Sequence, residues 1–257
     1  MLKVLAFLLL GYAALVGAMY LLQNRLIFFP QPLWQAPQGP HVQPAAVERP
    51  GATLRGWIVN PDSSGPLVIY FGGNAEELST AVATFARLDA TTALINYRGY
   101  GASDGSPSLG RLSDDAHAVV VAMHARWGAD RPVILFGRSI GSGLAAQATR
   151  AAPVDGVILM SPFRTLAEVG QRHMPFLPVR WLLRDNIDIT AAIDTLPDRI
   201  LVLYGARDTI IPPEESLALA RHLPPTARLV EYAGGHNEPL VDPEIRAAIE
   251  AFLADGA

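Results

Sequence analysis

The chain has 257 residues, half of them hydrophobic, so it can build one large domain with a sizeable core. Its net charge is −4, and the first 30 residues carry two basic and no acidic side chains, so the remainder is more acidic still. This charge excludes nucleic acid as an expected partner. The chain has no cysteine, which excludes disulfides, thiol catalysis and cysteine-based metal sites.

An apolar run of 19 residues, Val4–Leu22, lies between Lys3 and Arg25. An uncharged run of this length can span a bilayer as a helix. A cleaved signal peptide is the alternative, because the small residues at 16–18 loosely fit a cleavage site. Apolar residues continue beyond that site, so we predict that residues 1–24 stay in place as a single-pass membrane anchor.

The charges on the two sides of this run differ only slightly. Lys3 and the amino terminus precede it, and Arg25 and Arg49 follow it. The difference favours an inner-membrane protein with its amino terminus inside and the remainder on the periplasmic or extracytoplasmic side. Six prolines between residues 30 and 50 predict an extended connector over 25–52 that lies against the domain.

From residue 53 onward, strand-like and helix-like segments alternate. A first strand at 53–59 is expected to be antiparallel. The later strands are expected at 66–71, 92–96, 133–136, 156–160, 200–204 and 228–232, and the clearest helices at 112–127, 140–151, 214–223 and 243–253. This alternation predicts one α/β domain over 53–257, with a mostly parallel central sheet and helices on both faces.

The most informative motif is Gly137-Arg138-Ser139-Ile140-Gly141, which follows the strand at 133–136 and precedes a run of small residues. Strand, sharp turn and helix is the context of a nucleophile elbow. The two glycines let the strand and the helix crowd the turn, while the serine hydroxyl is presented above the sheet. We predict that Ser139 is a nucleophile.

A serine hydroxyl needs a base to take its proton and an acid to orient that base. In this architecture the acid and then the histidine follow the serine, each on a loop after a strand. Asp208 follows the strand at 200–204, and His236 follows the strand at 228–232. We therefore predict Asp208 as the acid and His236 as the base.

Acyl transfer also needs amide donors for the tetrahedral oxyanion. The residue after the nucleophile, Ile140, supplies one backbone amide. The Gly-rich turn after the strand at 66–71 supplies a candidate second, the amide of Asn74. The chain has no Walker lysine and no G-x-G-x-x-G, so we expect no nucleotide site at this turn.

Several segments together resemble the α/β-hydrolases. They are Phe71–Ala75, Asn96–Gly105, the elbow, Ser161–Phe163 and the loops that hold Asp208 and His236. The chain is similar to the membrane-anchored serine hydrolases that include the eukaryotic depalmitoylating thioesterases and many bacterial relatives. That group usually has His-Gly-Asn-Ala where this chain has Gly-Gly-Asn-Ala at 72–75, so one side chain near the oxyanion loop is missing. The glycines after the strand at 92–96 indicate that this loop has a structural role. The alternative is that Arg98 in this loop holds an anionic group.

The stretch 161–199 lies where this architecture carries its cap, and it is short for a lid. Apolar and basic side chains are interleaved along it, which suits an apolar substrate with a polar head group. The alternative is that the apolar groups only pack the cap onto the core. Pro175 and Pro178 would break any long helix there.

These patterns predict a serine hydrolase that cleaves a carboxylic ester or thioester through an acyl-enzyme on Ser139. Asp208 would fix the imidazole tautomer, and no metal or organic cofactor is needed. The expected partners are a small-molecule, lipid or acylated substrate and the membrane, while the oligomeric state stays open. A serine peptidase is the nearest alternative, and a non-catalytic anchored binding protein is the alternative of another class.

Overall fold

The computed structural model describes residues 1–237, 240 and 242–255. The strands are β1 (Val42–Arg49), β2 (Ala52–Val59), β3 (Leu67–Phe71), β4 (Thr91–Ile95), β5 (Val133–Arg138), β6 (Gly156–Met160), β7 (Ile200–Gly205) and β8 (Arg228–Tyr232). The helices are α1 (Leu2–Ile27), α2 (Val82–Phe85), α3 (Leu109–Trp127), α4 (Ile140–Ala148), α5 (Leu166–His173), α6 (Val179–Leu182), α7 (Pro213–Ala220) and α8 (Pro243–Ala254), with 3-10 turns η1 (Leu78–Ala81) and η2 (Thr190–Thr195).

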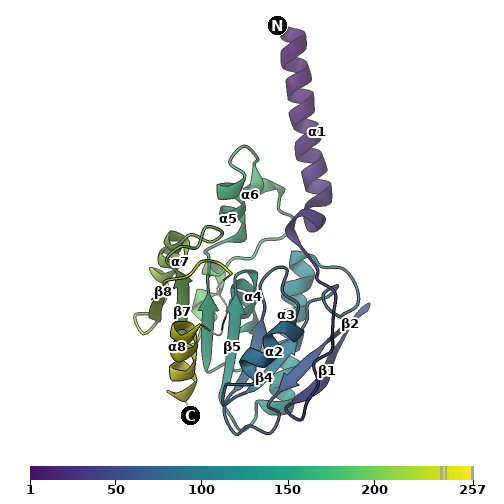
Figure 1. Ribbon diagram of the computed structural model, residues 1–257. Helices are drawn as coiled ribbons and strands as arrows, with labels where there is room; N and C mark the ends of the chain where they lie inside the picture. Colours follow the sequence, from purple (N-terminus) through teal and green to yellow (C-terminus); the bar gives the residue numbers. More distant parts are fainter. Residues whose placement is uncertain (238–239, 241, 256–257) are drawn as a thin grey trace.

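The strands form one sheet in the order β1-β2-β4-β3-β5-β6-β7-β8 (Figure 1). β2 pairs antiparallel with β1 and with β4, and every pair from β4 to β8 is parallel. The parallel strands read as continuous apolar runs because both of their faces are buried. The predicted α/β fold with a mostly parallel sheet is confirmed.

Two apolar clusters fill the two faces of the sheet. In β5, Val133 and Leu135 join the cluster under α3 and α4, whereas Ile134 and Phe136 join the cluster under α2 and α8. This division follows from the period of two in a strand, which sends successive side chains to opposite faces. The helices therefore cover both faces, as predicted.

β1 corrects one expectation. Residues 42–49, which the sequence analysis assigned to the extended connector, form an eight-residue strand paired with β2. Pro44 lies within it. An edge strand tolerates proline because half of its N–H groups have no neighbouring strand to pair with.

Two parts of the chain stand above the carboxyl ends of the parallel strands (Figure 1). The cap, residues 161–199 between β6 and β7, holds α5, α6 and η2. α1 projects away from the domain beside the cap, and within the described residues it is the one helix long and apolar enough to cross a membrane.

Arg98 belongs to the scaffold. Its guanidinium donates to both carboxylate oxygens of Asp115 in α3, at 2.6 and 2.7 Å, and Arg49 of β1 donates to the same carboxylate at 3.1 Å. The side chains of Arg98 and Asp115 are only 9% and 3% exposed. This pair ties the loop after β4 to α3.

Replacing Asp115 should therefore destabilise the fold, because it leaves Arg98 buried without its counter-charge. We expect Asp115→Ala to lower the free energy of unfolding by about 3–5 kcal/mol. The matched control is Asp255→Ala, which breaks the exposed Arg228–Asp255 pair and should cost less than about 1 kcal/mol. Urea unfolding in detergent, followed by tryptophan fluorescence, measures both, and equal effects would contradict the expectation.

Candidate active site

Ser139 sits at the sharp turn between β5 and α4. Its backbone has φ 53° and ψ −121°, a strained conformation for a residue other than glycine. The turn is tight: a Cβ on Gly137 would lie 2.2 Å from the carbonyl oxygen of Gly141, and a Cβ on Gly141 would lie 2.1 Å from that of Phe71. Only glycine fits at these two positions, so the motif folds as an elbow.

The structure brings the serine, histidine and aspartate together. His236 Nε2 lies 3.0 Å from Ser139 Oγ, and His236 Nδ1 lies 2.8 Å from Asp208 Oδ2. Asp208 and His236 come from the loops after β7 and β8, and parallel strands end at the same edge of the sheet. Asp208 Oδ1 accepts hydrogen bonds from the amides of Ile210 and Ile211, at 2.9 and 2.8 Å, which hold the carboxylate in place.

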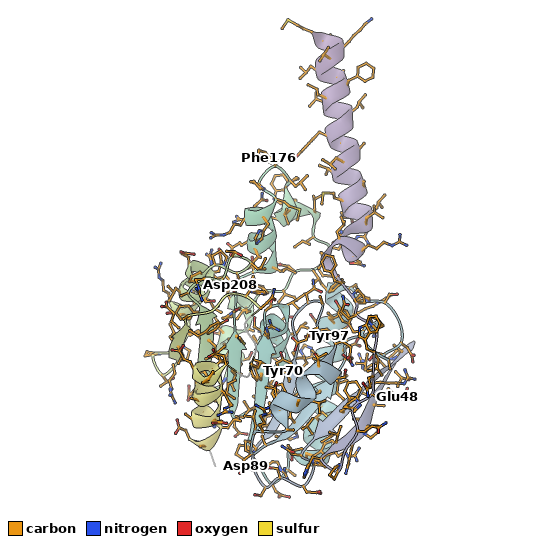
Figure 2. The ribbon with its side chains drawn as sticks, viewed as in Figure 1. Glu48, Tyr70, Asp89, Tyr97, Phe176 and Asp208 are labelled. Carbon is orange, nitrogen blue, oxygen red and sulfur yellow. The ribbon has the colours of Figure 1, made fainter. Side chains whose placement is uncertain are left out.

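Asp208 is labelled in Figure 2 on the loop beyond β7. Burial acts to raise its pKa, but the hydrogen bond and charge attraction of His236, together with the Ile211 amide, outweigh burial and hold the pKa below its ordinary value. The carboxylate is thus ionised at neutral pH. An ionised carboxylate at Nδ1 favours the tautomer whose free Nε2 can accept the serine proton.

Two backbone amides are available beside Ser139. Within the described residues, neither the amide of Ile140 nor that of Asn74 donates a hydrogen bond to the protein. The loop that carries Asn74 passes close to the nucleophile, because a Cβ on Gly73 would lie 3.9 Å from the Cβ of Ser139. The amide of Ile140 also begins α4, where the helix dipole favours negative charge.

The side chain of Asn74 has a role that the sequence did not indicate. Its Nδ2 donates to the carbonyl of Ile27, the last residue of α1, and its Oδ1 accepts from the amide of Phe29 at 3.3 Å and from the hydroxyl of Tyr100 at 2.8 Å. Burial raises the pKa of Tyr100 to about 12, so its hydroxyl stays a donor. The candidate oxyanion loop is thus fastened to the end of α1.

A second link joins three loops of the site. Arg138 donates to Glu76 Oε2 at 3.3 Å and to the carbonyl of His236 at 3.0 Å, and Glu76 Oε2 accepts from the amide of Gly73 at 2.7 Å. Arg138 and Glu76 are both largely buried, so this ion pair belongs to the interior of the site. In the sequence, Glu76 looks like an ordinary polar residue of the turn after β3. No sequence signal indicated its role in the site.

A cavity of about 390 Å³ lies over Ser139 and His236. Asn74, Ile140 and Arg138 line it beside these two. Its apolar walls are Ile27 from the end of α1, Phe163, Leu166 and Val169 from the cap, and Ile210 and Ile211 from the loop after β7. The cavity therefore offers an apolar compartment next to the nucleophile.

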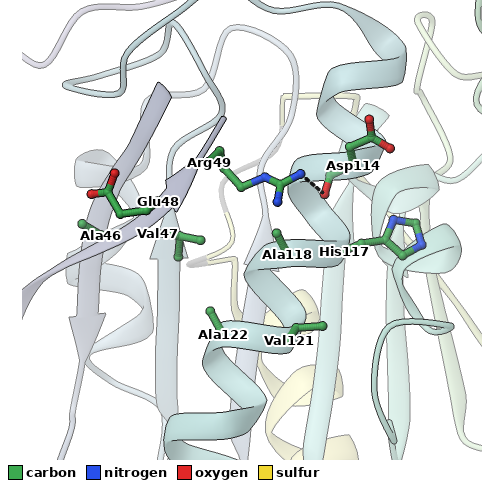
Figure 3. Close-up of a pocket in the computed structure, with 9 residues that line it drawn as sticks. All are labelled: Ala46, Val47, Glu48, Arg49, Asp114, His117, Ala118, Val121 and Ala122. Atoms are coloured by element: carbon green, nitrogen blue, oxygen red, sulfur yellow. Dashed lines mark hydrogen bonds between the residues drawn. The ribbon is translucent and has the colours of Figure 1, made fainter. Parts of the chain in front are cut away.

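A larger and shallower groove of about 640 Å³ lies between β1 and α3 (Figure 3). Arg49 crosses one end of it and donates to the carbonyl of Asp114. None of the residues predicted for the site lines it. Across the described part of the chain, no group of three or more His, Asp or Glu side chains could hold a metal ion.

Comparisons with known proteins bear on the family to which this chain belongs. Residues 67–185 match the family model described as serine aminopeptidase, S33, and residues 142–248 match the model described as serine hydrolase (FSH1). An uncharacterized protein of Mycobacterium tuberculosis is 35% identical over 250 residues, which cover 91% of this chain and 88% of that one.

Two further matches concern proteins with named activities. The lysophosphatidylserine lipase ABHD12 of Danio rerio is 30% identical over 174 residues, which cover 58% of this chain and 45% of the lipase. The solved structure of an esterase of Pyrococcus furiosus superposes with a TM-score of 0.70 at 17% identity, over 89% of this chain and 98% of the esterase. By fold, by family models and by relatives, this chain belongs to the serine hydrolases of the α/β-hydrolase superfamily.

Proposed function

We propose that the protein hydrolyses carboxylic esters or thioesters of acyl or lipid-like substrates through an acyl-enzyme on Ser139. The observation that carries the proposal is the continuous hydrogen-bonded chain from Ser139 Oγ through His236 to Asp208. The apolar cavity beside it supports an acyl substrate. The lipase and esterase among the similar proteins support the same substrate class.

In the first half-reaction, Ser139 Oγ attacks the carbonyl carbon while its proton passes to His236 Nε2. The amides of Ile140 and Asn74 stabilise the oxyanion, and each such donor contributes about 3 kcal/mol in comparable enzymes. The intermediate then collapses and the C–O or C–S bond breaks. The departing alkoxide or thiolate takes the proton from His236, so the products are the acyl-enzyme and an alcohol or thiol.

In the second half-reaction, His236 takes a proton from water, and the resulting hydroxide adds to the acyl carbonyl. The second tetrahedral intermediate expels Ser139 Oγ, which regains its proton from His236. The carboxylic acid is released. Asp208 remains ionised throughout and stabilises the imidazolium in both steps.

An aminopeptidase is the second candidate, because one family model carries that description. Such an enzyme needs a negative group to receive the ammonium of its substrate. None of the described residues that line the cavity is acidic. The lining therefore favours a neutral acyl chain over a peptide amino terminus.

We also propose that α1 is a retained membrane anchor and that the domain lies on the extracytoplasmic side. Gln23 is buried between α1 and the cap, where its Nε2 donates to the carbonyl of Leu182 at 3.2 Å and its Oε1 accepts from the amide of Arg184 at 3.1 Å. Tyr20 in the same helix accepts from Arg184 at 3.0 Å. These contacts support a helix that stays part of the folded enzyme.

Ser139→Ala should abolish covalent labelling by a fluorophosphonate and lower kcat for p-nitrophenyl esters and acyl thioesters by about 10⁴-fold or more. The matched control is Ser106→Ala at an exposed serine, which should change neither. Mass spectrometry of the labelled peptide identifies the modified residue. Labelling that persists in the Ser139→Ala variant would refute the assignment of the nucleophile.

Asn74→Ala should lower kcat by about 10- to 100-fold with little change in KM, because it frees the oxyanion loop and leaves the apolar walls of the cavity in place. Tyr100→Phe removes one of the three hydrogen bonds of the Asn74 side chain. It should lower kcat as well, but by less. Steady-state kinetics on one short ester separate kcat from KM. A rise in KM at constant kcat would show that Asn74 binds substrate instead.

Chain-length preference tests the cavity. Each added methylene that enters it should raise kcat/KM by about fourfold until the cavity is full, from about 0.8 kcal/mol per buried CH₂. Leu166→Trp, which fills part of the cavity from the cap, should move the optimum to shorter chains. A series of p-nitrophenyl esters measures both, and a flat series would contradict an acyl-binding cavity.

A further inference from the structure

The end of the cap exposes large apolar side chains. This segment, residues 174–181, is called the cap tip below. Phe176 and Trp181 are 88% and 87% exposed, and Met174 is 39% exposed. Figure 2 shows Phe176 at the far end of the cap, beside α1. The exposed apolar surface of the cap is thus gathered at the point farthest from the sheet.

The cap tip runs along α1. The hydroxyl of Tyr12 donates to the carbonyl of Phe176 at 2.9 Å, and Gln23 donates to the carbonyl of Leu182. Between these contacts the guanidinium of Arg184 stacks on the ring of Tyr20, 4.6 Å from its centre. At a rise of 1.5 Å per residue, Tyr12 and Gln23 are about 16 Å apart along the helix axis. The cap therefore accompanies α1 well into its apolar run.

This contact decides where the membrane can lie. If the cap tip were in water, α1 would be in water from Tyr12 onward. Only about ten residues, or about 15 Å, would then remain for a hydrocarbon core about 30 Å thick. The exposed side chains of Leu15, Leu21 and Leu22 would also face water. An α1 that spans the bilayer consequently carries the cap tip into it.

The backbone of the cap tip is suited to such an environment. Each carbonyl from 174 to 178 accepts a hydrogen bond from within the protein, and two of these residues are prolines, which have no N–H. Gln171 Nε2 lies within 3.4 Å of three of the carbonyls, and Tyr12 satisfies that of Phe176. Within residues 174–181, the amides of Phe176 and Arg180 donate to no protein group. Satisfied carbonyls lower the cost of leaving water.

Arginine side chains paired with glutamates lie at both ends of the cap tip: Arg172 precedes it, and Arg180 is near its last residue. Arg180 is 61% exposed and lies 3.6 Å from Glu168, and Arg172 pairs with Glu215 at 2.8 Å. Long arginine side chains can place their guanidinium groups among lipid phosphates while their stems lie along apolar surface. An apolar end with arginine side chains beside it is the distribution that a membrane interface favours.

From these observations we infer that the cap tip inserts into the bilayer beside α1, with a phospholipid membrane as its partner. Ile27 at the end of α1 and Leu166 of α5 both line the cavity over Ser139, so the cavity lies between the helix that would span the bilayer and the cap that carries the cap tip. Acyl chains then enter the cavity from the bilayer. The insertion rests on the proposed anchor, and the route of the substrate rests on the proposed hydrolase function.

Depth-dependent fluorescence quenching of the full-length protein tests the insertion. The protein is reconstituted into phosphatidylcholine–phosphatidylglycerol vesicles whose acyl chains are brominated or unmodified. Quenching by the brominated chains should be strong in the native protein and largely lost in Trp181→Phe. Because Trp181 is exposed, this variant keeps the fold, and far-UV circular dichroism verifies that.

The matched control is Trp127→Phe, at the last residue of α3 and away from the cap. Brominated chains should quench the fluorescence of this variant as they quench that of the native protein. Trp34, exposed in the connector, and Trp57, buried in β2, are present in all three proteins and contribute equally to them. Equal quenching in the native protein and Trp181→Phe, or no quenching in either, would overturn the insertion.

A second measurement separates the substrate route from the chemistry. The double variant Phe176→Ser, Trp181→Ser should hydrolyse a long-chain ester presented in vesicles about tenfold more slowly, from the lost burial of two aromatic side chains, and a short soluble ester at the native rate. Equal loss on both substrates would refute delivery from the bilayer. A native protein inactive on every ester would refute the proposed function and leave the quenching result standing.

Discussion

The crowding of β3, β5 and α4 around Ser139 is the constraint on which the rest of the structure depends. A Cβ on Gly141 would lie 2.1 Å from the carbonyl oxygen of Phe71, so the first turn of α4 packs directly against the end of β3. That approach holds Ser139 at positive φ and brings the loop after β3 over it. The positions of Ser139, the free amide of Ile140 and the candidate oxyanion loop therefore follow from a single packing contact.

α1 and the candidate active site are joined by direct contacts. Asn74 carries a candidate oxyanion donor on its backbone and is fastened by its side chain to the carbonyl of Ile27. Gln23 is buried against the cap, and Ile27 is itself a wall of the cavity. A helix that only attached the domain to a membrane would need none of these contacts with the domain. They give α1 a part in shaping the site, in addition to the anchoring that we propose for it.

Charged side chains hold the loops of the candidate site in place. Arg138 and Glu76 join the elbow, the loop after β3 and the loop of His236 through buried hydrogen bonds. Asp208 is held by two backbone amides in addition to His236. A non-catalytic binding protein would gain little from a histidine that contacts a serine hydroxyl at 3.0 Å on one side and an ionised carboxylate at 2.8 Å on the other. The alignment of these three side chains favours the hydrolase over the binding protein.

The amino-acid sequence by itself determined the strands, the main helices, the elbow and the order of serine, aspartate and histidine, because periodicity and turn chemistry are local. It also implied that Asp208 and His236 approach Ser139, since parallel strands end at one edge of the sheet. Tertiary structure decided that residues 42–49 form β1 and that Glu76 and the side chain of Asn74 brace the site. The bracing by Asn74 and Glu76 depends on Ile27 and Arg138, which lie far from them in the chain and which no local pattern encodes. β1 pairs with β2 in a tight hairpin, but Pro44 and the neighbouring prolines interrupt its strand pattern.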